Sequence, residues 1–164
     1  MLKIDRHSRT FRIASWLAVA LMLVVVFWFS AQDATTLNED LGGISAIKAW
    51  LAQTAAQIFG RQVDVSPIGH STEYLLLGAS IANALSLPNK EEEPARRICG
   101  IEVLPKTVLL STILSSLYGA TDEFHQIFTP GRSCDPADWL VDTLAALIGA
   151  AIVAIVLKHH ASRR

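Results

Sequence analysis

The stretch Phe11–Phe29 reads FRIASWLAVALMLVVVFWF and has no charged residue after Arg12. A helix needs about 20 mostly apolar residues to cross the hydrocarbon core of a bilayer, and this stretch approaches that length. Basic residues precede it, as they precede a signal peptide, but its apolar run exceeds the roughly 7–15 residues of a signal-peptide core. We therefore interpret it as a retained membrane anchor, with a signal peptide as the alternative.

Three more stretches reach a spanning length. They run from about Pro67 to Leu87, from about Pro105 to Phe128 and from about Ala137 to Leu157. Hydrophobic residues make up 51% of the 164-residue chain, which is high for a soluble protein. We predict an all-α fold: an integral membrane bundle of four transmembrane helices that forms one domain across residues 11–157, with cytoplasmic tails at 1–10 and 158–164.

Lysines and arginines are distributed unevenly between the two ends of these spans. Eleven of the 14 lie in the N-terminal segment, the loop between the second and third spans, or the C-terminal tail. Only Lys48, Arg61 and Arg132 lie on the other side. Because cytoplasmic loops carry an excess of Lys and Arg, we predict a multi-pass protein of the cytoplasmic (inner) membrane with both termini inside. Cys99 then lies inside and Cys134 outside, so they do not pair.

The predicted outer segment after the first span carries a helical pattern. Apolar residues recur there at steps of three and four: Ile44, Ile47, Leu51, Ala55 and Ile58. This spacing predicts a short amphipathic helix across about Ser45–Phe59. Trp50 suits the headgroup region, which is consistent with a helix lying flat on the outer membrane surface. A helix that caps the bundle fits the pattern equally well, and the two placements are compatible with each other.

The last three spans share a feature at their outer ends. Their uncharged runs, Tyr74–Leu87, Thr107–Thr121 and Thr143–Leu157, are only about 14 or 15 residues long, short of the roughly 20 that a bilayer requires. Each span reaches full length only by including polar residues at its outer end: His70, Glu73, Asp122, Glu123, His125, Gln126, Asp138 and Asp142. A carboxylate inside the membrane costs about 3 kcal/mol, so we expect these groups to face inward and meet.

Helical spacing supports a shared site. His70 and Glu73 are three residues apart and Asp138 and Asp142 four apart, so each pair lies on one helix face. The predicted cluster holds five carboxyl groups and one nearby cation, Arg132. Crowded like charges require relief, through protonation, a metal ion such as a divalent cation, or a cationic ligand group.

The residues after the third span predict a turn. Pro130-Gly131 is typical of a tight turn in which Gly131 takes a positive φ. The turn places Arg132 at the outer mouth, where its guanidinium suits a phosphate or carboxylate; neutralising Asp122 is the alternative role. In the fourth span, the small residues Ala145, Ala146, Gly149 and Ala150 predict close helix packing.

The segment 122–132, DEFHQIFTPGR, resembles the signature of the VanZ-like membrane proteins. GHSTEY at 69–74 and DWLVDTLAALIGA at 138–150 are similar to further elements of that family, as is the Phe29–Gln32 exit from the first span. The resemblance runs from about Trp28 to Gly149. Two departures make this site more acidic: Ser66-Pro67-Ile68 replaces a frequent lysine, and Asp142 stands where asparagine is common. The family is named for a member linked to resistance to the glycopeptide teicoplanin, and the resemblance implies a bacterial cell-envelope protein without a settled chemical activity.

Three hypotheses for function follow, all with the lipid bilayer as a partner. In the first, the outer site binds a lipid-linked or cell-wall-related ligand through Arg132 and the acidic cluster. In the second, the cluster holds zinc, manganese or magnesium and supplies a general base, which makes the protein a metal-assisted intramembrane hydrolase or transferase. In the third, the polar groups only join helices in an accessory subunit of a membrane complex. The net charge of −1 indicates no nucleic-acid partner, and the oligomeric state stays open.

Overall fold

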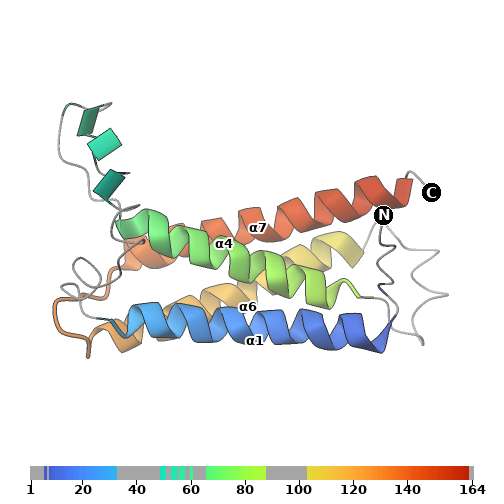
Figure 1. Cartoon of the computed structure of the whole chain (residues 1–164), viewed down its shortest axis with the longest axis horizontal. Helices are drawn as coiled ribbons and strands as arrows, with labels where there is room; N and C mark the ends of the chain where they lie inside the picture. The colour runs from blue at the N-terminus through green and yellow to red at the C-terminus, as the bar shows by residue number, and fades with distance from the viewer. Residues whose placement is uncertain are drawn as a thin grey trace.

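The computed structural model describes residues 6, 8–32, 49–50, 53–54, 56–57, 60, 66–87 and 103–162. This part of the chain is all-α and contains no strand. Its four long helices are α1 (Arg9–Ser30), α4 (Ser66–Leu85), α6 (Val103–Gln126) and α7 (Pro136–Ser162). They run alternately up and down, so α1 and α6 end where α4 and α7 begin (Figure 1). We call that end of the bundle the polar end.

Local signals in the sequence start the helices. The Ser8 hydroxyl caps α1 by accepting a hydrogen bond from the Phe11 N–H at 3.1 Å. The Asp135 carboxylate accepts a bond from the Ala137 N–H at 2.8 Å, and Pro136 occupies the first position of α7, where a missing N–H costs nothing. The predicted spans agree with the four helices to within a few residues, except that α7 continues to Ser162, into the predicted tail.

The connection from α6 to α7 contains the predicted turn. The Arg132 N–H donates to the Thr129 carbonyl oxygen at 3.1 Å, and Gly131 has a φ of 74°. Glycine has no Cβ and adopts this left-handed conformation without strain. The tight turn at Pro130-Gly131 is therefore confirmed.

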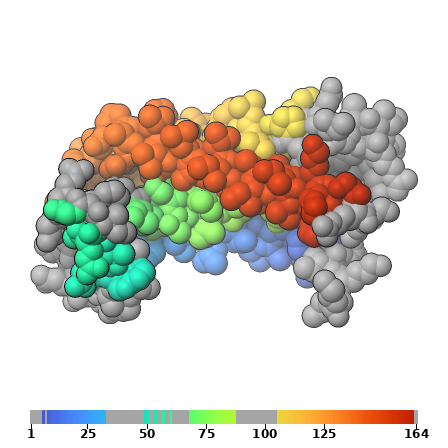
Figure 2. Space-filling view, turned by 90° about the horizontal axis from the view of Figure 1, so that it is seen from above, coloured from blue at the N-terminus to red at the C-terminus, as the bar shows by residue number. Residues whose placement is uncertain are grey.

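Helix α4 is the centre of the bundle, because it packs against α1, α6 and α7. It lies closest to α7, and the two run side by side along the molecule (Figure 2). At this seam Gly149 rests on the backbone of Leu75, and Gly78 rests on the backbone of Ala146. The predicted small-residue face of α7 is buried at all four positions, so the close packing that it predicts is confirmed.

Helix α6 reverses the arrangement of a helix in a soluble protein. Its buried residues are polar: Thr107, Ser111, Ser115, Asp122, Glu123 and Gln126. Its exposed residues include a run of large apolar side chains: Leu109, Leu110, Ile113, Leu114 and Leu117. A helix of a water-soluble domain turns its apolar stripe toward the core, so the outer surface of α6 is suited to lipid.

By length and composition, α1 and α7 could each cross a membrane, whereas α4 and α6 do not meet the same criterion. Two of the four predicted spans therefore have direct support. Of the predicted amphipathic helix, residues 49–50, 53–54 and 56–57 are helical, and Trp50 is exposed; the rest of that range lies outside the described residues. The predicted cytoplasmic loop at 88–102, with Cys99, also lies outside them.

Candidate functional site

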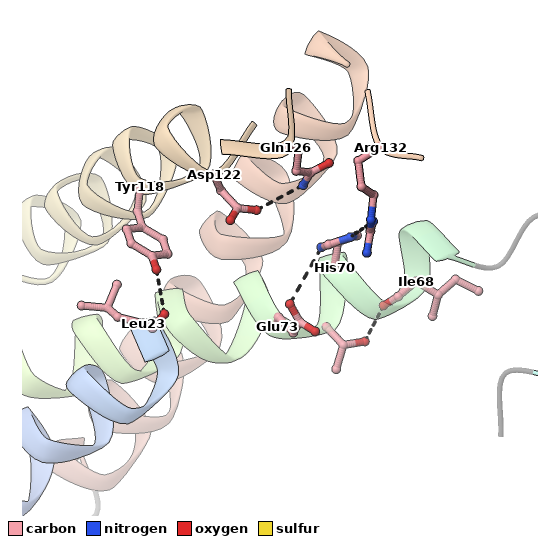
Figure 3. Close-up of polar contacts among 9 residues, drawn as sticks. Leu23, Ile68, His70, Glu73, Tyr118, Asp122, Gln126 and Arg132 are labelled. Atoms are coloured by element: carbon pink, nitrogen blue, oxygen red, sulfur yellow. Dashed lines mark hydrogen bonds and ion pairs between the residues drawn. The ribbon is translucent and has the colours of Figure 1, made fainter. Parts of the chain in front are cut away.

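A chain of three side chains links the α6–α7 connection to the start of α4. The Arg132 guanidinium donates a hydrogen bond to Nε2 of His70, with 3.0 Å between the nitrogens. On the other side of the same ring, Nδ1 lies 3.8 Å from Oε2 of Glu73. Figure 3 shows this row of arginine, imidazole and carboxylate. The sequence spacing predicted the pairing of His70 with Glu73, but Arg132 contacts His70 rather than Asp122.

This contact defines the protonation of the His70 ring. A guanidinium can only donate hydrogen bonds, so Nε2 of His70 must accept and carry no proton. The ring proton of the neutral imidazole is then on Nδ1, which faces Glu73. His70 therefore lies between Arg132, to which it is hydrogen-bonded, and Glu73, whose Oε2 is 3.8 Å from Nδ1.

Helix α6 contributes two buried carboxylates with different partners. Asp122 accepts a hydrogen bond from the side-chain amide of Gln126 at 3.3 Å (Figure 3). Glu123 accepts one from the backbone N–H of Asp135 at 2.8 Å. Glu123 thus holds the start of α7 against the end of α6, which is a structural role, while Asp122 stays within the interior of the polar end.

Helix α7 brings Asp142 and Asp138 to the same region. Asp142 is only 4% exposed, and Asp138 is half-buried one turn earlier. The charges lie close enough to interact: Glu73 with Asp122, Asp142 and Arg132, and Asp142 with Asp122, Glu123 and Asp138. Carboxyl groups from α4, α6 and α7 therefore lie within electrostatic range of one another.

The His125 side chain packs against α1. It shares a helix face with Asp122 and Gln126 in the sequence pattern, but its ring packs on Phe27 of α1, with 4.9 Å between the ring centroids. Its side chain is half-buried. The contact ties α6 to α1 at the polar end.

Tyr74 is a member of the site that the sequence reasoning did not select. Its side chain is completely buried, its ring packs on Gly119 of α6, and its hydroxyl lies within electrostatic range of Asp122, Glu123 and Asp142. The signal was present, because Tyr74 follows Glu73 and is four residues from His70, on the same face of α4. We define the polar cluster as His70, Glu73, Tyr74, Asp122, Gln126, Arg132 and Asp142.

In the part of the chain that the structure describes, the polar cluster contains buried atoms without a hydrogen-bond partner. Those that concern a ligand are Oε2 of Glu73, the hydroxyl of Tyr74 and Nε of Arg132. Buried polar groups in native proteins are almost always hydrogen-bonded, so each exception calls for an unseen water, ion or ligand. An acceptor, a cationic donor and a hydroxyl are thus left unsatisfied in one cluster.

The arrangement of the described residues does not support the hypothesis of a metal site. Within the described ranges, no group of three or more His, Cys, Asp or Glu side chains is arranged to hold a metal ion. The predicted ligands are instead interleaved with Arg132, Tyr74 and Gln126.

The fold and the site together define a class: an all-α bundle in which two helices could cross a membrane and polar groups from several helices lie at one end. The comparison with protein families agrees, because the VanZ/LLP1 family model matches residues 15–157. The chain belongs to the VanZ/LLP1 family. No curated protein and no solved structure matches it significantly.

Proposed function

We propose that the protein crosses the membrane four times, with both termini in the cytoplasm and the polar end outside. The apolar exterior of α6 supports a lipid-facing position, and its polar interior explains why hydropathy alone does not identify it as a span. Inward-facing polar residues are the arrangement expected of functional groups in membrane helices. The distribution of Lys and Arg supports the orientation.

We further propose that the polar cluster binds a lipid-linked or cell-wall-related molecule that carries an anionic group and an amine. The three unsatisfied buried atoms are the observation that carries this proposal. Arg132 suits a phosphate or carboxylate, because its planar guanidinium presents several donors at once. Glu73 offers an acceptor to an ammonium group, and Asp122 and Asp142 add negative charge around it.

His70 has a positioning role in this arrangement. It accepts from Arg132 through one ring nitrogen and turns the other toward Glu73. Arg132, which binds the anion, and Glu73, which binds the amine, are thereby held at a fixed distance from each other. A zwitterion that contacts both should therefore bind more tightly than a simple anion or a simple amine.

Calorimetric titration of the detergent-purified protein tests the proposal. Glycerophosphoethanolamine supplies a phosphate and an amine, and a dialanine peptide supplies a carboxylate and an amine; glycerophosphate and ethanolamine are the single-charge controls. Arg132→Ala should weaken zwitterion binding by about 10- to 100-fold, because a hydrogen bond to a charged group contributes roughly 1.5–3 kcal/mol. Glu73→Gln should weaken only the amine-bearing probes.

The matched control is Arg9→Ala, since Arg9 is exposed at the other end of the bundle. It should bind as the unaltered protein does. Equal affinities for the unaltered protein, Arg132→Ala and Glu73→Gln would contradict the proposal, as would the absence of binding by both zwitterions.

A further inference from the structure

A groove of about 500 Å³ lies along the seam between α4 and α7. Its lining consists of Ile68, Ser71, Thr72 and Leu75 from α4 and Val141, Leu144, Ala145 and Ile148 from α7. The groove is open to the surface rather than enclosed. Six of these side chains are apolar. The Thr72 hydroxyl donates a hydrogen bond to the Ile68 carbonyl oxygen of its own helix at 2.7 Å.

The groove adjoins the polar cluster on both helices. Ser71 and Thr72 lie between His70 and Glu73 in the sequence, and Val141 precedes Asp142. Successive residues of a helix point about 100° apart. The same turns of α4 and α7 therefore face the polar cluster on one side and the groove on the other.

We propose that this groove holds one hydrocarbon chain of the lipid whose headgroup binds the polar cluster. The inference rests on the proposed function and narrows its ligand class to a membrane lipid with a zwitterionic, amine-bearing headgroup. Ile68, Leu144 and Ile148 are each about half exposed, so the groove opens on the surface that meets the bilayer. Ser71 and Thr72 of the groove lining share turns of α4 with His70 and Glu73, so the groove begins at the same depth in the membrane as the polar cluster.

The chain gains no hydrophobic free energy by entering the groove, because bilayer lipid is as apolar as the groove walls. Affinity therefore comes from the headgroup, and the groove orients the lipid. Filling the groove should exclude the chain and leave headgroup binding intact, which separates the two proposals experimentally.

The test uses the full-length protein in phosphatidylcholine nanodiscs with a small fraction of phosphatidylethanolamine that carries a diazirine on one acyl chain. After irradiation, mass spectrometry maps the labelled residues. Labelling should concentrate on Leu75, Leu144 and Ile148, and an excess of unlabelled phosphatidylethanolamine should remove it. Leu117, which is exposed on α6, should carry only labelling that does not respond to this competition.

Val141→Phe should fill the groove and remove the competed labelling, while glycerophosphoethanolamine binding in detergent stays unchanged. Val156→Phe is the matched control, because Val156 has a similar exposure on the same helix, 46% against 42% for Val141, and does not line the groove. It should label as the unaltered protein does.

The inference would be overturned if all exposed helices of the unaltered protein were labelled equally and unlabelled phosphatidylethanolamine did not reduce this labelling. If glycerophosphoethanolamine still binds in that case, the proposed headgroup site is unaffected. Efficient disulfide-linked dimers of Val141→Cys, with no groove labelling, would mean that a second copy of the chain covers the groove. Loss of both headgroup binding and groove labelling in the unaltered protein would refute the proposed function itself.

Discussion

Replacement of Gly149 by alanine should separate α4 from α7. A Cβ at this position would meet the carbonyl oxygen of Leu75, and it would lie 2.9 Å from the Leu75 carbonyl carbon and 3.2 Å from the Ala79 nitrogen. All three are backbone atoms and have no rotamer that relieves the overlap. The helices must therefore move apart to accommodate the methyl group.

The energetic cost follows from the packing. Extra methylenes in a well-packed core typically cost about 1–3 kcal/mol, and the backbone contacts at Gly149 favour the upper part of that range. Gly78→Ala should have a similar effect, because its Cβ would meet the backbone of Ala146 across the same seam. The double variant should cost less than the sum, since one separation of the helices relieves part of both overlaps.

The assay is unfolding by dodecyl sulfate in mixed micelles, followed by far-UV circular dichroism. Gly69→Ala is the matched control: it lies in α4, and a Cβ there meets no atom within 4 Å. Its expected change is neutral to stabilising by about 0.5–1 kcal/mol, because alanine is favoured over glycine in helices. If Gly149→Ala and Gly69→Ala unfold at the same detergent fraction as the unaltered protein, the close seam is refuted.

Two further predictions separate binding from stability. Tyr118→Phe removes the 2.7 Å hydrogen bond from the Tyr118 hydroxyl to the Leu23 carbonyl oxygen. This variant should destabilise the bundle by about 1 kcal/mol and leave zwitterion affinity unchanged. Tyr74→Phe removes a hydroxyl that has no hydrogen-bond partner in the described part of the chain, so it should weaken zwitterion binding severalfold at little cost in stability. The reverse pattern in the calorimetric and unfolding data would exclude Tyr74 from the site. Glu123→Ala removes the acceptor of the Asp135 N–H and should destabilise by about 1–3 kcal/mol, whereas Glu123→Gln keeps an acceptor and should lose less; equal unfolding curves for the two variants would argue against this helix-linking role.

Much of the fold could be predicted from hydropathy. The apolar run after Arg12 and the four spanning lengths led to four long helices, all of which are present. Hydropathy was less informative for α6, because the polar residues that shorten its apolar run lie inside the bundle. Only the exposure of the individual residues shows that the outer face of α6 is apolar.

The candidate site was predictable in position but not in its contacts. The depth of the polar residues and their three- and four-residue spacing indicated that eight residues would meet: His70, Glu73, Asp122, Glu123, His125, Gln126, Asp138 and Asp142. The His125 ring instead packs on Phe27 of α1. The direction of Arg132 toward His70 depends on the turn at Gly131 and on the relative placement of α4 and α7, which a single sequence does not encode locally. Tyr74 was not selected, although it follows Glu73 and is four residues from His70, on the same face of α4.

We propose that the polar end of the bundle faces outward, where a headgroup reaches it. Cys134 lies in the α6–α7 connection at that end and is exposed with a free thiol. A Cys99→Ser variant leaves it as the sole cysteine of the chain, and a Cys134→Ser variant serves as the control. A membrane-impermeant maleimide applied to intact cells should label the Cys99→Ser protein and should label the control only after permeabilisation. Labelling of Cys134 only after permeabilisation would contradict the account.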